Sequence, residues 1–600
     1  MYDRSTVIKM TLDDYFTAND IKTMSLEQVR YELIDITDTA IALENQVKEK
    51  GRKLTFLKDS LVPYQVYRIA VECEMIHTIR RGRVLVPAVY IDDEHDRDYG
   101  LYKLLITRHD EEAYFYRVCR RIQPEFSIKQ CVEVLSYLKS EGGRDYKVET
   151  EDEALVAVAN GVVNEYADDQ QEHFIDWEEA RKRGYVFTTK WHTDYNPNAQ
   201  QPVFHDTENG RDMVPEDVLF DIGGDAERVE AIKAAMHAVL RPNWRVEAAM
   251  LLVDPHFNGN NGKSTLGEIL QSLTGEGNYV ATKISELDGN FNLASLLDAK
   301  AIISTDADDS QYIEHSGNFK MLTCNESMTI HVKYKDDVTC RWQGKIWAST
   351  NGYPRFREVS DAIDKRLYLI DCNTHFSNDG SGTGLKKNKD IKDVFLKDKA
   401  TLEYIFKMLL DLNYRELPTF DFQKQLKKDF RSETNPVDAF LNEITDEDTR
   451  NEVVEGWQSW TCQNPHWDYY PIDYLYLLFQ GFYYQNYNKK ASMSLQKFRI
   501  SLRSWVKKNN EEWELPVDSK GEMMRVSHCG ELTSKAESFT LKYMSAEAGN
   551  ESALHSEWCN SRLGSAGDFN TIFMPSTAKT KYTCIRRKKA VQAQGQKGDK

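Results

Sequence analysis

No stretch of this sequence is apolar for long enough to cross a membrane, since a spanning helix needs about 20 mostly apolar residues. Residues 1–10 lack the pattern of a secretory signal peptide. The ten cysteines are scattered and never form a C-x-x-C pair, which is typical of reduced thiols rather than of a disulfide framework. These absences predict a protein of the cytoplasm with no membrane partner.

Positive charge is scarce relative to negative charge over the 600 residues. There are 77 Lys and Arg against 95 Asp and Glu, which gives a net charge of −18. An acidic average argues against a protein that coats nucleic acid generally, but it does not exclude a local basic channel, because binding depends on where the charges lie. Apolar residues make up 41% of the chain, enough for real cores, and the length indicates several domains.

One stretch carries a specific chemical pattern. An apolar run at residues 248–253 predicts a buried strand, a Gly- and Asn-rich loop follows, and Lys263 then begins a helical pattern. A phosphate-binding loop needs this order, because its N–H groups and the helix N-terminus both face the anion. Lys263 is expected to reach the β- and γ-phosphates of ATP, and the Ser264 hydroxyl to hold Mg²⁺. The predicted nucleotide-binding residues are Asn258, Gly259, Asn260, Asn261, Gly262, Lys263, Ser264 and Thr265.

The loop departs from the usual G-x-x-x-x-G-K-[ST] motif at one position, since Phe257 stands where the first Gly belongs. Gly259 then has to make the sharp turn alone. The alternative is an ordinary Gly/Asn turn that happens to precede Lys-Ser-Thr. The strand before the loop and the helix after it favour the phosphate-binding interpretation.

Two further predicted strands end in polar side chains. The first, at residues 299–306, ends in Asp306, whose carboxylate would complete the Mg²⁺ site, while Asp308 would polarise the attacking water. The second, at residues 344–350, is followed by Asn351, which would contact the γ-phosphate. Arg366 comes next and would act as an arginine finger on a neighbouring subunit's nucleotide. The predicted catalytic residues are Lys263, Asp306, Asp308, Asn351 and Arg366, and the predicted metal ligands are Ser264 and Asp306.

Residues 328–342 predict a β-hairpin with its tip near residues 334–337. Channels for single strands follow the backbone with positive side chains and stack bases on aromatic ones, and this hairpin offers both kinds. A surface hairpin with ordinary lysines is the alternative, which Asp336 and Asp337 favour. The predicted DNA-binding residues are His331, Lys333, Tyr334 and Lys335.

Taken together, these segments resemble superfamily 3 helicases of the phage and plasmid primase-associated type, which are related to the poxvirus primase-helicase. The similarity covers about residues 150–500. The matching segments are Asn258-Gly-Asn-Asn-Gly-Lys-Ser-Thr, Ser304-Thr-Asp306, Phe319-Lys-Met-Leu-Thr, Lys345-Ile-Trp-Ala-Ser-Thr-Asn, residues 361–367, Ala159-Asn-Gly-Val, Asp194-Tyr-Asn-Pro-Asn-Ala and Asn435-Pro-Val-Asp-Ala-Phe-Leu.

The resemblance implies an AAA+-like α/β core, a hexameric ring, and ATP-driven 3′-to-5′ movement along single-stranded DNA that unwinds forked DNA. It implies that the hairpin with Lys333 and Lys335 lines the central channel. ATP and Mg²⁺ are the implied cofactors, and a separate primase or polymerase is an expected partner. The chain departs from the family at Phe257 and at Cys324-Asn325, where Gly-Gly is usual.

Both ends of the chain carry weaker signals. Residues 92–95 are acidic, but no second acidic strand accompanies them, so we interpret them as a solvated loop rather than a primase metal site. Amphipathic helices are predicted at residues 472–487 and 495–508, and they resemble a winged-helix region, with a solvated helix face as the alternative. His528, Cys529, His555, Cys559 and Cys584 match no standard zinc spacing. The basic stretch 579–600 is predicted to be disordered.

The predicted fold is α/β: a P-loop, AAA+-like ATPase core with a mixed N-terminal region and a mostly helical, winged-helix-like C-terminal region. The predicted domains are 1–145 (mixed α/β, role unknown), 146–225 (preceding the helicase core), 226–432 (superfamily 3 ATPase), 433–560 (winged-helix-like) and 561–600 (basic tail). The predicted function is a replicative DNA helicase of a phage or mobile element, working in the bacterial host cytoplasm. The alternatives are an initiator or loader that uses ATP as an assembly switch, and a packaging motor on duplex DNA.

Overall fold

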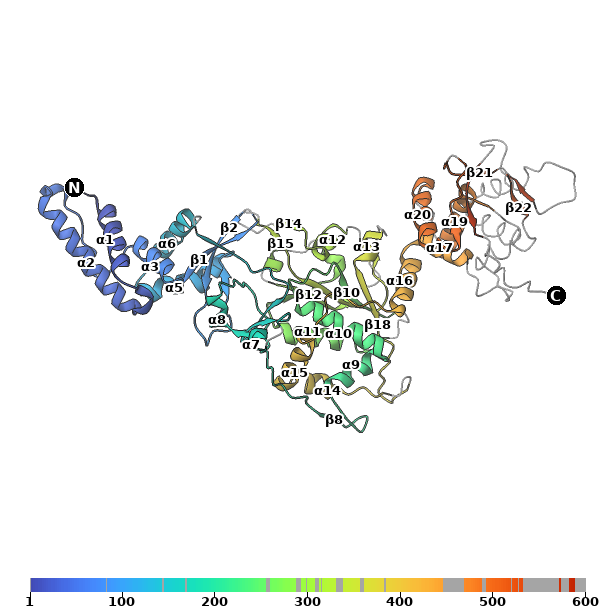
Figure 1. Cartoon of the computed structure of the whole chain (residues 1–600), viewed down its shortest axis with the longest axis horizontal. Coiled ribbons are helices and arrows are strands. Elements are labelled where there is room, and N and C mark those ends of the chain that lie inside the picture. The colour runs from blue at the N-terminus through green and yellow to red at the C-terminus, as the bar shows by residue number, and fades with distance from the viewer. Residues whose placement is uncertain are drawn as a thin grey trace, which may run out of the picture. The chain divides into compact units, whose positions relative to one another are not determined.

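The computed structural model divides the chain into two units, Met1–Gln423 and Lys424–Lys600, and each is described by itself (Figure 1). In the described part of the chain, no helix is both long enough and apolar enough to cross a membrane. The described residues are 2–82, 84–142, 145–167, 170–254, 259–287, 293–297, 299–307, 312–313, 316–330, 338–356, 361–381, 385–445, 469–487, 491, 493–519, 521–526, 528–531, 571–573 and 582–588.

The first unit begins with helices packed against a four-stranded sheet. Its strand order is β3-β2-β1-β4, with β1 antiparallel to β2 and parallel to β4. The Ser25 side chain caps α2 by accepting the Gln28 N–H at 3.2 Å. Of the apolar stripe on α2, Val29 and Leu33 are buried in the core that helices and sheet share. The elements are α1 (Arg4–Ala18), α2 (Leu26–Val47), α3 (Pro63–Glu72), β1 (Ile76–Arg81), β2 (Val84–Tyr90), β3 (Tyr102–Leu104), α4 (Arg108–Asp110), α5 (Tyr116–Ile122), α6 (Ile128–Glu141) and β4 (Tyr146–Val148).

The next segment contains a small antiparallel sheet and a separate hairpin. Strands β5, β6 and β7 pair in chain order, and β8 pairs with β9. Residues 184–190 form no regular element, although the apolar side chains at 185–187 would fit a strand. Their carbonyls serve two different segments, since Val186 O accepts the Thr150 N–H and Phe187 O accepts the Tyr102 N–H, both at 2.9 Å. The elements are β5 (Leu155–Val158), β6 (Gly161–Asn164), α7 (Gln170–His173), β7 (Phe174–Asp176), α8 (Trp177–Lys182), β8 (Phe204–Asp206), β9 (Arg211–Met213) and α9 (Pro215–Gly223).

A five-stranded parallel sheet, in the order β11-β12-β16-β10-β18, forms the centre of the first unit. Every residue of β10, β16 and β18 is buried, which explains why β10 is apolar along its whole length. Helices α10, α11 and α15 share its core. The elements are α10 (Ala226–Leu240), β10 (Ala249–Val253), α11 (Lys263–Thr274), β11 (Tyr279–Val280), β12 (Ala301–Ala307), β13 (Tyr312–Ile313), α12 (Gly317–Thr323), β14 (Ser327–Ile330), β15 (Val338–Arg341), β16 (Lys345–Thr350), β17 (Arg355–Phe356), α13 (Asp361–Lys365), β18 (Leu367–Asp371), α14 (Lys389–Asp393) and α15 (Lys399–Leu410).

The second unit packs three helices against a short antiparallel sheet in which β24 is the shared strand. Helices α19 and α20 have the bounds that the sequence predicts. The prediction of disorder is wrong at β24, because Cys584 and Ile585 are buried and Arg586 pairs with Glu514. The elements are α16 (Asp421–Thr434), which crosses the unit boundary, α17 (Pro436–Thr445), β19 (Tyr470–Pro471), α19 (Ile472–Tyr487), α20 (Leu495–Lys508), β20 (Trp513–Glu514), β21 (Arg525–Val526), β22 (His528–Glu531), β23 (Thr571–Phe573) and β24 (Tyr582–Arg587).

The observed architecture is therefore mixed α/β, with several sheets, and its five-stranded sheet is parallel throughout. Predicted domains 1–145 and 146–225 lie within the first unit, together with all but the last residues of the predicted ATPase domain. The carboxyl ends of parallel strands meet at one edge of their sheet, and this edge is where open α/β sheets bind ligands.

Candidate functional site

The predicted phosphate loop connects the carboxyl end of β10 to the start of α11. Gly259, Asn260 and Gly262 have φ of 61°, 49° and 82°, so three loop residues adopt the left-handed conformation. A Cβ at Gly262 would also lie 2.6 Å from Cγ1 of Ile222, so this position requires glycine for both conformation and space. Asn258, like Phe257, lies outside the described residues.

Lys263, the first residue of α11, is buried, with 5% of its surface exposed. Its ammonium donates to Asn261 Oδ1 at 2.7 Å and lies 3.4 Å from Asp254 Oδ2. The same Asp254 oxygen accepts the Gly259 N–H at 2.8 Å. The loop thus neutralises its own lysine with an internal carboxylate. A phosphate oxygen carries the same charge sign and accepts the same donors, so it can replace this carboxylate.

The segment that follows β18 holds the other side of the loop. The Phe376 N–H donates to Asn260 O at 2.9 Å, and His375 Nδ1 lies 3.2 Å from Gly259 O. Burial raises the pKa of the nearby Cys372 thiol to about 12, so that thiol stays neutral beside the loop. These contacts fix the loop backbone without using its inward-facing N–H groups.

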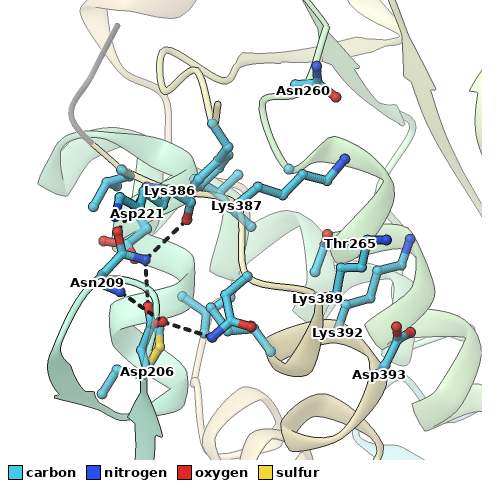
Figure 2. A pocket seen from close by; sticks show the side chains of 18 of the residues that line it. Asp206, Asn209, Asp221, Asn260, Thr265, Lys386, Lys387, Lys389, Lys392 and Asp393 are labelled. Atoms are coloured by element: carbon cyan, nitrogen blue, oxygen red, sulfur yellow. Dashed lines mark hydrogen bonds between the residues drawn. The ribbon is translucent and has the colours of Figure 1, made fainter. Parts of the chain in front are cut away.

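A pocket of about 180 Å³ opens beside the first turn of α11 (Figure 2). Figure 2 shows Lys389 and Lys392 beside Thr265. Lys392 pairs with Glu268 at 2.6 Å, whereas in the described part of the chain Lys387 and Lys389 contact no carboxylate. The lining therefore adds positive charge next to the phosphate loop. The loop side contributes Asn260, Gly262, Ser264 and Thr265, and the apolar lining is Met213, Val218, Ile222, Phe376, Leu385 and Ile391.

A set of amide hydrogen bonds joins the β8–β9 hairpin to the segment before α14 and closes one side of the pocket. The Asn209 side chain donates to Lys386 O at 3.1 Å and accepts the Lys386 N–H at 2.8 Å. Asn388 Nδ2 donates to Asp206 Oδ1 at 2.8 Å, and Asn209 Nδ2 also donates to Asp206 Oδ2 at 2.7 Å. Two segments about 180 residues apart in sequence are thereby held together.

The predicted metal and γ-phosphate residues lie on strands that share this edge of the sheet. Asp306 is near the carboxyl end of β12, where the pairing with β16 shifts register between Ser304 and Ala307. Such irregularities re-aim side chains next to active sites. Asn351 follows β16 directly and is exposed, and β16 lies between β12 and β10. Asp308 lies outside the described residues.

Arg366, the predicted arginine finger, contacts its own chain at the opposite edge of the sheet. Its carbonyl accepts the N–H of Ala249, the first residue of β10, whereas the phosphate loop follows the last residue of that strand. Its Nε donates to Cys324 Sγ at 2.9 Å, and Cys324 Sγ lies 3.6 Å from Glu247 Oε2. The structure therefore does not bring Arg366 to the loop of the same chain.

The predicted hairpin is present as antiparallel β14 and β15, with Ser327 opposite Arg341 and Thr329 opposite Thr339. Its tip is outside the described residues, and so are the four residues predicted to bind DNA, namely His331, Lys333, Tyr334 and Lys335. Among the described residues no group of three or more His, Cys, Asp and Glu side chains could hold a metal ion.

Three parts of the site were missed at the sequence level. Asp254 ends an apolar strand, just as Asp306 does, and that signal was available. Lys387 and Lys389 follow a glycine-rich stretch and gave no signal of their own. Asn209 lies far from the loop in sequence, so only the tertiary structure reveals its role.

Comparison with known proteins gives limited matches. Residues 257–366 match the model of a protein family described as a "Family of unknown function (DUF5906)". Among solved structures, an apo structure of the NrS-1 C-terminal region is similar at 11% identity, covering 75% of this chain and 94% of that chain, with a TM-score of 0.38. A second structure of the same region matches at 12% identity, covering 77% and 98%, with a TM-score of 0.40.

Proposed function

We propose that this protein is an ATP-hydrolysing DNA helicase that serves the replication of a phage or mobile element. The observation that carries the proposal is the loop itself. A buried lysine begins a helix directly after two left-handed glycines, at the carboxyl edge of a parallel sheet. Backbone N–H groups and a helix N-terminus there provide an anion site, which the lysine completes.

In this proposal the nucleotide's phosphates replace the Asp254 carboxylate as the partner of Lys263. The Ser264 hydroxyl, in the first turn of α11, would hold Mg²⁺ together with the phosphates, and Asp306 would orient its water shell. The metal supplies charge neutralisation on the transferred phosphoryl group. The pocket beside the loop is lined by both polar and apolar side chains, which suits the sugar and base of the nucleotide.

The role of Asn351 follows from the position of its strand. Because β16 lies directly beside β10, an exposed amide that follows β16 stands where the terminal phosphate would lie. Arg366 is at the other edge of the sheet, so it can serve only a second subunit's nucleotide. Ring assembly would then be required for turnover, as in other motors that supply an arginine in trans.

The coupling to DNA rests on the β14–β15 hairpin. In the chain, the hairpin lies between β12, which contains Asp306, and β16, which Asn351 follows. A change at the nucleotide therefore has a short covalent path to the hairpin. The alternative, an initiator that uses ATP only as an assembly switch, shares the same loop. Strand separation distinguishes the two functions.

The proposal is tested by Mg²⁺-dependent ATP hydrolysis of the full chain, with and without single-stranded DNA. We expect Lys263→Ala to lower turnover at least 100-fold, because it removes the charge that neutralises the transferred phosphate. The matched control is Lys397→Ala, which removes an exposed lysine that pairs with Asp393 and does not line the pocket. Turnover that survives in Lys263→Ala overturns the assignment.

A further inference from the structure

A second cavity, of about 270 Å³, lies where the N-terminal sheet meets the β14–β15 hairpin. Its walls are formed by the end of β1, by the end of β4 and the residues that follow it, by the segment just before β12, and by the hairpin. The residues that matter here are Arg80, Arg81, Glu149, Lys300 and Arg341. The cavity therefore joins the domain of unknown role to the element that we expect to carry DNA.

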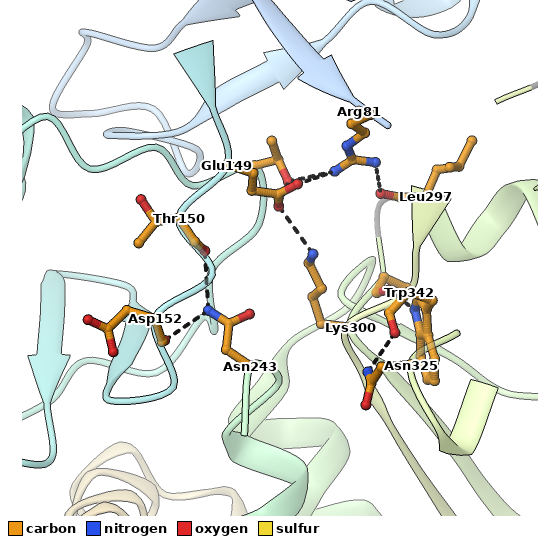
Figure 3. Close-up of polar contacts among 11 residues, drawn as sticks. Arg81, Glu149, Thr150, Asp152, Asn243, Leu297, Lys300, Asn325 and Trp342 are labelled. Atoms are coloured by element: carbon orange, nitrogen blue, oxygen red, sulfur yellow. Dashed lines mark hydrogen bonds and ion pairs between the residues drawn. The ribbon is translucent and has the colours of Figure 1, made fainter. Parts of the chain in front are cut away.

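Positive charge dominates this cavity although the whole chain has a net charge of −18. Four cations line it, against the carboxylates of Glu149 and Glu151. Figure 3 shows Glu149 between Arg81 and Lys300, at 3.0 Å and 3.1 Å from their donor nitrogens. One carboxylate thus serves two cations. Although burial alone would raise the pKa of Glu149, these two cations lower it to about 2, so the group remains ionised.

The other two arginines of the cavity, Arg80 and Arg341, are exposed, so a ligand can reach them. Arg80 donates to Gly82 O at 3.1 Å and to the Tyr146 hydroxyl at 2.8 Å, and its guanidinium lies 5.3 Å from the centre of that ring. Arg341 is the last residue of β15 and is exposed. In the described part of the chain neither guanidinium contacts a carboxylate. Tyr146, on the edge strand β4, is 40% exposed.

We propose that this cavity binds the backbone of single-stranded DNA, with Arg80 and Arg341 on phosphates. Tyr146, which contacts Arg80 just outside the cavity lining, would stack on a base. Exposed guanidiniums form paired hydrogen bonds with phosphate oxygens, and an aromatic ring beside them is the arrangement used for single strands. Arg81 Nε is buried and has no hydrogen-bond partner among the residues that the structure describes, which places a further donor at the cavity wall. This inference rests on the proposed function only in naming DNA as the nucleic acid.

The buried network explains how the cavity keeps its shape. Arg81 also donates to Leu297 O at 3.1 Å and to Thr188 Oγ1 at 3.0 Å, so it connects the N-terminal sheet to the segment before β12. Arg81, Glu149 and Lys300 are therefore unsuitable as test positions, because their loss would disturb the fold. Arg80, Arg341 and Tyr146 leave this network intact.

The test is fluorescence anisotropy of a labelled oligo(dT) with the full chain, without nucleotide, across a series of salt concentrations. We expect Arg80→Ala/Arg341→Ala to weaken binding about tenfold at low salt and to reduce the salt slope by about 1.4, since each phosphate contact on a single strand contributes about 0.7. Tyr146→Ala should weaken binding severalfold with the slope unchanged, and Tyr146→Phe should restore it, because stacking carries no charge.

The matched control, Arg108→Ala/Lys182→Ala, makes the same change in net charge at two exposed, carboxylate-paired positions outside the cavity. Equal losses in the test and control variants, or wild-type affinity in the test variant, overturn the inference. So does a wild-type chain that leaves oligo(dT) unbound. Because nucleotide is absent, a failure of ATP hydrolysis would refute the proposed function and leave this result standing.

Discussion

The Lys263 ammonium and the Asp254 carboxylate form a buried pair, 3.4 Å apart, at the start of the helix that follows the phosphate loop. The two side chains are 6% and 4% exposed, so neither charge is solvated by water. In the proposed function, a nucleotide has to displace the Asp254 carboxylate before its phosphates can pair with Lys263. In the chain without nucleotide, the Lys263 ammonium is therefore paired with the Asp254 carboxylate.

We expect Asp254→Asn to tighten ATP binding about tenfold, because the amide keeps an acceptor for the Gly259 N–H but no longer competes as an anion, and a charged hydrogen bond is worth about 1.5 kcal/mol or more. The affinity is measured by calorimetric titration. Asp393→Asn, at another pocket-lining carboxylate, is the control and should bind as wild type does. Weaker binding by Asp254→Asn would show that the carboxylate supports the loop rather than competing with phosphate.

The two loop glycines should respond differently to alanine. At Gly262 the added Cβ meets Ile222 at 2.6 Å, so Gly262→Ala should abolish measurable ATP binding and lower the melting temperature. At Gly259 no atom of the described residues lies within 4 Å of a Cβ, so Gly259→Ala faces mainly the left-handed backbone cost of about 1–2 kcal/mol. Titration and thermal unfolding of both variants measure the difference. Equal losses at the two positions would contradict this loop geometry.

Arg366 should act between subunits. Because it lies at the amino edge of its own sheet, Arg366→Ala should bind ATP normally yet turn over at least 100-fold more slowly. Mixing Arg366→Ala with Lys263→Ala chains should restore part of the activity, since some interfaces would combine an intact loop with an intact arginine. Cys324→Ala, which removes the contact to Arg366 Nε, is the companion variant and should keep most turnover. No recovery at any mixing ratio would place Arg366 outside the chemistry.

Glu149 should make the first unit acid-sensitive. The carboxyl has a pKa of about 2 in the folded chain against 4.5 for the free group, so its stabilisation is complete above pH 4.5 and is lost as the pH falls toward 2. Glu149→Gln should cost on the order of 2–3 kcal/mol at pH 7 and should flatten the loss of stability below pH 4.5. Denaturant unfolding at several pH values tests this. Parallel acid profiles for the two proteins would rule it out.

Local patterns in the sequence were enough to predict the strand–loop–helix at Lys263, the β14–β15 hairpin, and helices α19 and α20 with their bounds. Each of these depends on residues that are close together in the chain. Residues 184–190 show the limit, because the consecutive apolar residues at 185–187 fit a strand but the carbonyls of this segment accept hydrogen bonds from two separate segments. The strand β24 was missed because its two buried residues stand among basic neighbours.

In the candidate site, too, local sequence patterns predicted some features and only the tertiary structure revealed others. The positions of Asp306 and Asn351 follow from the strands β12 and β16, and the sheet order places β16 directly beside β10 and β12 one strand further away. Asp254 lies only nine residues before Lys263 and was within reach of the sequence, whereas the pairing of Asn209 with Lys386, 177 residues apart, depends on the tertiary structure. The location of Arg366 at the far edge of the sheet likewise becomes visible only in three dimensions.

The measurement that tests the central claim most directly is the unwinding of forked DNA with a 3′ or a 5′ single-stranded tail, by wild type, Lys263→Ala and Lys333→Ala/Lys335→Ala. The account predicts ATP-dependent unwinding that requires the 3′ tail, is absent in Lys263→Ala, and fails in the hairpin variant while basal ATP hydrolysis is kept. ATP-dependent DNA binding without any strand separation would contradict it and would identify the protein as an initiator instead.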